Sequence, residues 1–171
     1  MLRSDPVHID HRALRFDKLR RLIADSDHGI HDLSRIENSD AGLPRFNMPF
    51  ELGLYLGANR FGGPVQRKKT ALIMVTEPFR LPVFLSDLSG NDPQAHYGRV
   101  DDVIRIVRKY LHARPEGRPL PGATRMLAEF NRFKSALPKL AHELQLELHE
   151  IDPYREYRVY LDVLVEFLRQ A

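Results

Sequence analysis

Six polar residues between positions 32 and 51 are the part of this 171-residue chain best equipped for chemistry: Asp32, Ser34, Arg35, Arg45, Asn47 and Glu51. Together they offer carboxylates, a hydroxyl, an amide and guanidinium groups, which can hold a sugar and a phosphate while one carboxylate reacts. The first of them follow an apolar segment that predicts a strand, and the last opens a segment that predicts a helix. Ligands of open α/β sheets lie beyond the carboxyl ends of the strands, so we expect a site there.

Glu51 is the candidate catalytic residue. The pattern from Met48 to Asn59 predicts a helix that Asn47 caps, with Glu51 in its first turn. Free N–H groups at a helix start favour a carboxylate anion. Such an anion can stabilise the oxocarbenium-like charge that develops when a ribosyl–nitrogen bond breaks, or can attack the anomeric carbon. The alternative is that Glu51 only stabilises its own helix.

The neighbouring residues are candidate nucleotide-binding groups. Asp32 and Ser34 at a strand end can hold ribose hydroxyls, or they can simply close an Asx or Ser turn. Arg35 and Arg45 can pair with a diphosphate through bidentate hydrogen bonds, or they can be ordinary surface arginines. His31, beside Asp32, is the one histidine that we consider as an acid or base, and a partly buried structural histidine is its alternative.

Other site classes are not favoured. The pairs His8 with His11 and His28 with His31 lack the His-Glu-x-x-His pattern, so no metal and no other cofactor is predicted. The stretch RALRFDKLRR carries five basic residues, but the net charge is only +3, so we expect a solvated helix face and no nucleic-acid partner. The absence of cysteine excludes disulfides, thiolate metal sites and a cysteine nucleophile.

The distribution of apolar residues predicts where the protein is found in the cell and which class of protein it belongs to. The first residues, MLRSDPVHIDH, are polar and contain no secretory apolar region, so we expect a cytoplasmic protein. No apolar run approaches the ~20 residues that a membrane helix needs. With 43% hydrophobic residues, the chain can bury the core of one ordinary domain.

The elements expected to position the candidate site alternate between helix and strand. In chain order we predict a helix at 15–26, a strand ending at 32–34, a helix at 48–59 that packs through Phe50, Leu54 and Gly57, a buried strand at 70–75, a short helix at 81–88, an edge strand at 94–97 and a helix at 101–111. This predicts an α/β core with a parallel sheet over residues 1–113.

The rest of the chain is expected to be helical. After the proline-rich linker HARPEGRPLPG we predict helices at 124–136 and 138–146, separated by a break or a kink at Pro138, and a last helix at 154–169. Residues 114–171 would then form a helical extension packed on the core. Its last helix carries an apolar stripe, expected as the seam against the core: Tyr154, Tyr157, Tyr160, Leu161, Leu164 and Leu168. A homodimer through that stripe or through an unpaired sheet edge is the alternative.

One part of the chain resembles a motif of bacterial TIR-like, predicted nucleotide-binding proteins. It consists of GIHDLSR, then GLPRFNMPFELGLYLG, and then the buried strand. It is similar, more distantly, to nucleoside 2-deoxyribosyltransferases, and the resemblance covers about residues 15–112. It implies a flavodoxin-like sheet and cleavage or transfer at the N-glycosidic bond of NAD or a nucleotide. By the same resemblance Glu51 matches the catalytic glutamate, Asn47 opens its helix, and Asp32 with Ser34 match the preceding strand end.

The chain departs from that pattern at its start. Such relatives begin with a further strand and helix, and residues 1–14 are too few and too polar for both. Truncation, completion of the sheet by another chain, or an incomplete pocket would each explain this. Two hypotheses about function remain, an N-glycosyl hydrolase or transferase and a non-catalytic, nucleotide-sensing or self-associating module of a bacterial defence or signalling system.

Overall fold

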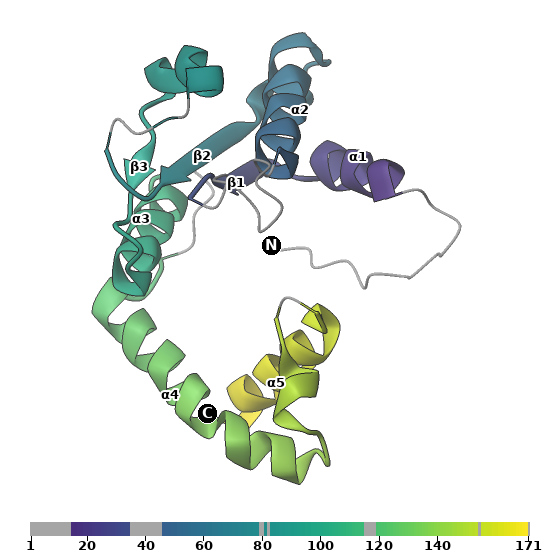
Figure 1. Ribbon diagram of the computed structural model, residues 1–171, viewed down its shortest axis with the longest axis vertical. Coiled ribbons are helices and arrows are strands. Elements are labelled where there is room, and N and C mark those ends of the chain that lie inside the picture. Colours follow the sequence, from purple (N-terminus) through teal and green to yellow (C-terminus); the bar gives the residue numbers. More distant parts are fainter. Residues whose placement is uncertain are drawn as a thin grey trace. The chain divides into compact units, whose positions relative to one another are not determined.

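The computed structural model describes residues 15–34, 46–78, 81, 83–114, 119–153 and 155–170. The chain divides into two compact units, one within Asp10–Leu120 and one within Pro121–Ala171. The first holds the helices α1 (Arg15–Asp25), α2 (Asn47–Phe61) and α3 (Val100–His112), the strands β1 (His28–Asp32), β2 (Thr70–Val75) and β3 (Gln94–Ala95), and the 3-10 segments η1 (Gln66–Lys68) and η2 (Val83–Asn91), as Figure 1 shows.

The three strands form a parallel sheet in the order β1-β2-β3. The ladder pairs His28 with Thr70 and Asp32 with Met74, and Met74 with Gln94 on the other side of β2. An α/β fold with a parallel sheet is therefore confirmed. Because all strands run the same way, their carboxyl ends meet at one edge of the sheet.

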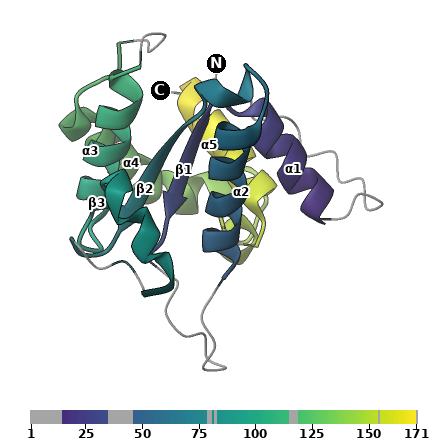
Figure 2. The ribbon, with the colours of Figure 1, turned by 90° about the horizontal axis from the view of Figure 1, so that it is seen from above.

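Strand β2 is buried on both faces. Ile73 and Val75 pack with Leu52 of α2, whereas Leu72 and Met74 pack with Tyr110 of α3. Figure 2 shows α2 and α3 on either side of the strands. This is the environment that a continuous apolar run such as TALIMV requires, since successive side chains of a strand point to opposite faces.

The predicted packing face of α2 is wrong. Leu52 and Tyr55 are its buried residues, whereas Phe50 is 53% exposed. Leu52 and Tyr55 are three residues apart, so they lie on the same side of the helix, and that side covers β1 and β2. Phe50 instead lies against α1, with its ring centroid 6.1 Å from that of Phe16.

The remaining elements of this unit lie close to the predicted ranges, and two of them differ in kind. The segment expected as a short helix at 81–88 is the 3-10 segment η2, and β3 holds only the first half of the strand expected at 94–97. The side chains of Leu81, Leu85 and Leu88 nevertheless pack on the α2 face of the sheet. The crossover from β2 to β3 thus covers the same face as α2.

A polar cluster at the amino end of β2 joins the layers. The hydroxyls of Tyr55 in α2 and Tyr110 in α3 both donate to the carbonyl of Thr70, at 3.2 and 2.8 Å. The Thr70 hydroxyl lies 2.8 Å from that of Tyr110 and 3.0 Å from Nδ1 of His28. Each half-buried polar group thus has a partner, as burial requires.

The second unit is helical, with α4 (Ala123–Glu143), η3 (Leu148–Ile151) and α5 (Tyr157–Gln170). A break or a kink was predicted at Pro138, and the break is wrong, because α4 runs through that residue. Proline costs a helix one hydrogen bond. Leu140 and Ala141, one turn further on, are buried in the core of this unit, and their burial favours a continuous helix.

The packing face predicted for α5 is also wrong in part. Val163 and Phe167 are its buried residues, whereas Tyr157 and Leu168 are 57% and 61% exposed. Tyr160 and Leu164 do pack against the same core. The buried face is therefore rotated from the stripe of tyrosines and leucines that the sequence suggested, and Tyr154 lies outside the described residues.

Gly29 in β1 is a position where a side chain is excluded. An added Cβ would lie 2.7 Å from Nε2 of His31 and 3.0 Å from the Tyr55 ring, whereas at Gly53, on the open side of α2, it would meet nothing within 4 Å. We expect Gly29→Ala to lower the free energy of unfolding by about 1–3 kcal/mol through overpacking. Gly53→Ala should raise it by up to about 1 kcal/mol, because glycine weakens a helix.

Urea unfolding followed by circular dichroism measures both changes. Equal stabilities of Gly29→Ala and the wild-type chain would show that β1 does not approach α2 this closely.

Candidate functional site

Asp32 is the anchor of the carboxyl edge of the sheet. It is the last residue of β1, and its Oδ1 accepts the backbone N–H of Ser34 at 2.9 Å. The same oxygen lies 3.3 Å from Nε2 of His96, which follows β3. The side chain of Asp32 is 41% exposed. A strand-end carboxylate is thus fixed from two sides while it still reaches solvent.

His96 orients Asp32 from across β2. Its side chain is only 6% exposed, and its Nδ1 accepts the N–H of Gly98 at 3.1 Å. With Nδ1 as acceptor, the neutral ring carries its proton on Nε2 and donates it to Asp32. Both ring nitrogens are occupied, so His96 serves as a positioning residue and not as a proton carrier.

Tyr97 lies in a tight turn that follows His96 at the carboxyl edge of the sheet. Tyr97 and Gly98 have φ values of 53° and 69°, in the left-handed region that non-glycine residues rarely adopt. Backbone bonds hold the turn: the N–H of Tyr97 donates to Thr76 at 2.8 Å, and that of Arg99 donates to His96 at 2.9 Å. Tyr97 is 58% exposed. The turn therefore exposes an aromatic ring directly after His96 in the chain.

This arrangement suits a hydroxylated ligand. Within the described ranges, Oδ2 of Asp32 accepts no hydrogen bond, whereas Oδ1 accepts two. An ionised carboxylate has about four acceptor positions, so Asp32 retains capacity for sugar hydroxyls. Ser34, which is half-buried, lies two residues further along the chain and donates its backbone N–H to Asp32.

Glu51 and Asn47 lie elsewhere on α2 than expected. Phe46 is the N-cap, so Asn47 is the first helical residue and not the cap, and Glu51 is the fifth residue, beyond the first turn. The helix dipole falls off within one turn, so it supports an anionic Glu51 less than expected. Glu51 is half-buried, and it makes no hydrogen bond or ion pair to Asp32 or Ser34 in the described part of the chain.

Leu54 and Ala58 line the side of α2 next to α1, whereas Leu52 and Tyr55 are buried against the sheet. The structure therefore brings together Asp32, Ser34 and the unpredicted His96. Among the described residues, Glu51 does not join them through a hydrogen bond or ion pair. Arg35 and Arg45 lie outside the described residues.

His96 and Tyr97 are the site residues that sequence reasoning missed. Both fall inside the segment expected as an edge strand at 94–97, whereas β3 ends at Ala95. A polar residue that follows a parallel strand belongs to the same edge as Asp32, so the observed end of β3 brings His96 to that edge.

His31 lies on the face of β1 that α2 covers. It is 8% exposed, its ring packs edge-on against Tyr55 at 5.4 Å, and its Nε2 is buried without a hydrogen-bond partner among the described residues. Burial lowers the pKa of His31. These properties are those of a neutral histidine in the core.

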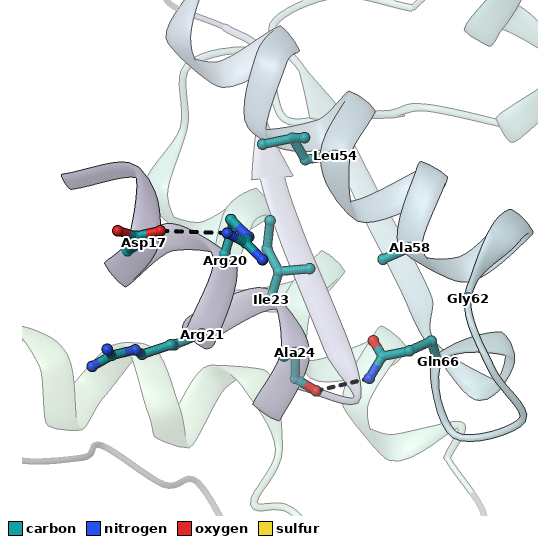
Figure 3. A pocket seen from close by; sticks show the side chains of 9 residues that line it. All are labelled: Asp17, Arg20, Arg21, Ile23, Ala24, Leu54, Ala58, Gly62 and Gln66. Carbon is teal, nitrogen blue, oxygen red and sulfur yellow. Dashed lines mark hydrogen bonds and ion pairs between the residues drawn. The ribbon is translucent and has the colours of Figure 1, made fainter. Parts of the chain in front are cut away.

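A hollow of about 680 Å³ lies between α1 and α2, apart from the Asp32 edge. Figure 3 shows Ile23 and Leu54 facing it, with Asp17 and Arg20 paired at 3.4 Å on one wall. At its end the amide of Gln66 donates to the carbonyl of Ala24 at 3.2 Å. Its polar groups largely pair with one another, so it does not present a chemical site.

Over the described ranges, no three histidine or acidic side chains come together as metal ligands, and no helix is long and apolar enough to cross a membrane. Comparison of the chain with protein-family models, with curated proteins and with solved structures finds no match.

The buried His31 makes stability depend on pH. The unfolded chain binds a proton on this ring near pH 6.5, whereas the folded chain resists it because burial lowers the pKa. Stability is therefore greatest above pH 6.5 and falls as the pH drops below that value, since the unfolded state then binds more protons.

We expect the replacement His31→Leu to reduce this fall between pH 7.5 and 5.0, as measured by urea midpoints. His112→Gln, at an exposed position of the same unit, should keep the pH dependence of the wild-type chain. An unchanged pH dependence in His31→Leu would contradict a buried, neutral His31.

Proposed function

We propose that this chain is a nucleotide-binding domain of TIR-like, flavodoxin-like architecture that holds a ribose at Asp32. The observation that carries the proposal is the exposed strand-end carboxylate, whose Oδ1 is fixed by Ser34 and His96 while its Oδ2 has no hydrogen-bond partner among the described residues. A preorganised acceptor at the carboxyl edge of a parallel sheet suits vicinal ribose hydroxyls. NAD or another nucleotide is the proposed ligand class.

The remaining groups at this edge suit the other parts of a nucleotide. The Ser34 hydroxyl can donate to a ribose oxygen, and the exposed ring of Tyr97 can stack on a base. Arg35 and Arg45 remain the proposed partners of a diphosphate, and Asn47, at the start of α2, remains a proposed contact.

Catalysis is the further part of the proposal, with Glu51 as the key carboxylate. In hydrolysis the bond from the anomeric carbon to the base nitrogen breaks, and its electron pair leaves with the base. Water adds its oxygen to that carbon and loses a proton. That proton is released when the base is the nicotinamide of NAD, which leaves neutral, and it goes to the base when the base would otherwise leave as an anion. Glu51 would stabilise the positive charge on the sugar. It is half-buried and therefore reaches solvent, which this role requires.

One observation favours a second candidate function. Glu51 makes no hydrogen bond or ion pair to Asp32 or Ser34 among the described residues. A ribose bound at Asp32 would then be held without being cleaved. The second candidate is a non-catalytic, cytoplasmic nucleotide sensor in a bacterial defence or signalling system.

Binding is tested with Asp32→Asn, which keeps an oxygen for Ser34 and His96 but replaces the open acceptor with an amide group. We expect titration calorimetry with NAD, ATP and adenosine to show saturable binding of at least one of them by the wild-type chain. Asp32→Asn should weaken that binding about tenfold or more, on the order of 1.4 kcal/mol.

Asp87→Asn is the matched control, because Asp87 is exposed and lies in η2. Equal affinities of the Asp32→Asn and Asp87→Asn variants would place the ligand elsewhere. No binding by the wild-type chain would remove the proposed function.

Turnover is tested separately by the release of nicotinamide from NAD or of free base from nucleosides, followed by chromatography. The enzyme hypothesis expects a roughly 100-fold or greater loss in Glu51→Gln, since an amide cannot stabilise the cationic sugar. Glu129→Gln, an exposed glutamate change on α4, should retain full activity. Saturable binding without release of base would select the sensor.

A further inference from the structure

The connection from α2 to β2 exposes apolar side chains between basic ones. Its sequence from Arg60 to Lys68 is RFGGPVQRK. Phe61 is 85% exposed and Val65 is 67% exposed, and these are the two most exposed large apolar side chains in the part of the chain that the structure describes. One such side chain is ordinary on a protein surface. Two of them four positions apart in one short connection mark a surface that contacts something apolar.

Three cations of the same connection are available to a partner. Arg60, Arg67 and Lys68 are exposed, and none of them forms an ion pair with a carboxylate of the described residues. Nε of Arg67 donates to the carbonyl of Gly62 at 3.1 Å, which leaves the terminal nitrogens of that guanidinium for another acceptor. Four residues line a hollow of about 580 Å³ at this place: Asn59, Arg60, Phe61 and Arg67. Basic and apolar groups therefore share one surface.

Hydrogen bonds hold the connection in place before any partner binds. The side-chain amide of Asn59 donates to the carbonyls of Arg67 and Lys69, at 3.0 and 2.8 Å. Figure 3 shows the amide of Gln66 donating to the carbonyl of Ala24 at the end of α1. The connection is thus fixed to both helices, so little conformational entropy is lost when its exposed side chains meet a partner.

This surface is separate from the proposed nucleotide site. The connection precedes β2 and lies at the amino edge of the sheet, whereas Asp32 ends β1 at the carboxyl edge. The acidic residues near the amino edge, Asp25 and Asp27, act on the buried ammonium of Lys69. A partner of the connection is therefore anionic and does not compete with a nucleotide at Asp32.

The combination of groups favours a lipid surface over a nucleic acid. Single-stranded nucleic acid is held by successive aromatic rings along a basic groove. The connection has one ring, Phe61, and its other exposed apolar side chain is the aliphatic Val65. A bilayer takes aromatic and aliphatic side chains into its interfacial region, while its anionic headgroups attract arginine and lysine.

We propose that the connection from α2 to β2 is a docking site for the anionic surface of a lipid bilayer. Phe61 and Val65 enter the interfacial region, and Arg60, Arg67 and Lys68 lie beside the phosphates and carboxylates of the lipids. Each cation strengthens such binding about fivefold at low ionic strength. Two apolar side chains and three cations give reversible attachment to the surface.

The probe is a vesicle made of equal parts of phosphatidylserine and phosphatidylcholine, sedimented with the full chain at low ionic strength. We expect saturable binding, at least about tenfold tighter than to vesicles of phosphatidylcholine alone, and we expect added salt to weaken it because salt screens exposed charges. No binding, or equal binding to the two kinds of vesicle, would overturn the proposal. Binding of a labelled oligothymidylate without binding of vesicles would assign the surface to nucleic acid and would overturn it as well.

Protein variants locate the site. Phe61→Ser should weaken vesicle binding about tenfold, and Arg60→Gln about fivefold. Leu168→Ser and Arg125→Gln, at exposed positions of α5 and α4, should leave it unchanged. All four changes are at exposed side chains, so equal urea midpoints check that each variant is folded. Equal effects of Phe61→Ser and Leu168→Ser would place the lipid contact elsewhere and refute the proposal.

A fluorescent reporter tests whether the connection enters the bilayer. The chain contains no tryptophan, so Phe61→Trp supplies a single one at this place. Its emission should shift to shorter wavelength with the anionic vesicles and stay unchanged with the neutral ones, whereas that of Leu168→Trp should not shift with either. An unshifted emission of Phe61→Trp on fully bound protein would show that position 61 stays in water, which contradicts the proposal.

Discussion

Both faces of strand β2 are apolar and must be covered, because Leu72 and Met74 lie on one face of the sheet and Ile73 and Val75 lie on the other. Helices α2 and α3 must therefore lie on opposite sides of it, and both of its edges are free to pair with β1 and β3. The candidate site follows from that pairing. Asp32 and His96 are 64 residues apart in the chain, yet their strands end on either side of β2 and their side chains meet at 3.3 Å.

The opposite end of the sheet shows how a polar group can be buried at little cost. Lys69 is 5% exposed, and burial lowers its pKa, although nearby Asp27 and Asp25 act in the other direction. Its ammonium donates to the last carbonyls of α1, which have no partners within the helix and carry its negative end. The buried charge thereby holds α1 beside the sheet.

The sequence predicts those parts of the fold that local pattern determines. Strand β2 was predicted at its observed bounds because a continuous apolar run between polar residues has few other interpretations, and α3 was predicted within one residue at each end. Pro138 and α5 mark the limit of this reasoning. Whether a helix continues through proline, and which of two apolar stripes it buries, depends on the core that it packs against.

For the candidate site, prediction from sequence is limited by how the strands pair and by the residue at which a helix begins. Asp32 was predicted at a strand end and lies there, with Ser34 in the turn expected as one of its two roles. His96 could not be identified as its partner, because that contact depends on a two-residue strand that pairs across β2. Glu51 was placed by the assumption that Asn47 caps α2, and a shift of one residue in the helix start moves the carboxylate out of the first turn.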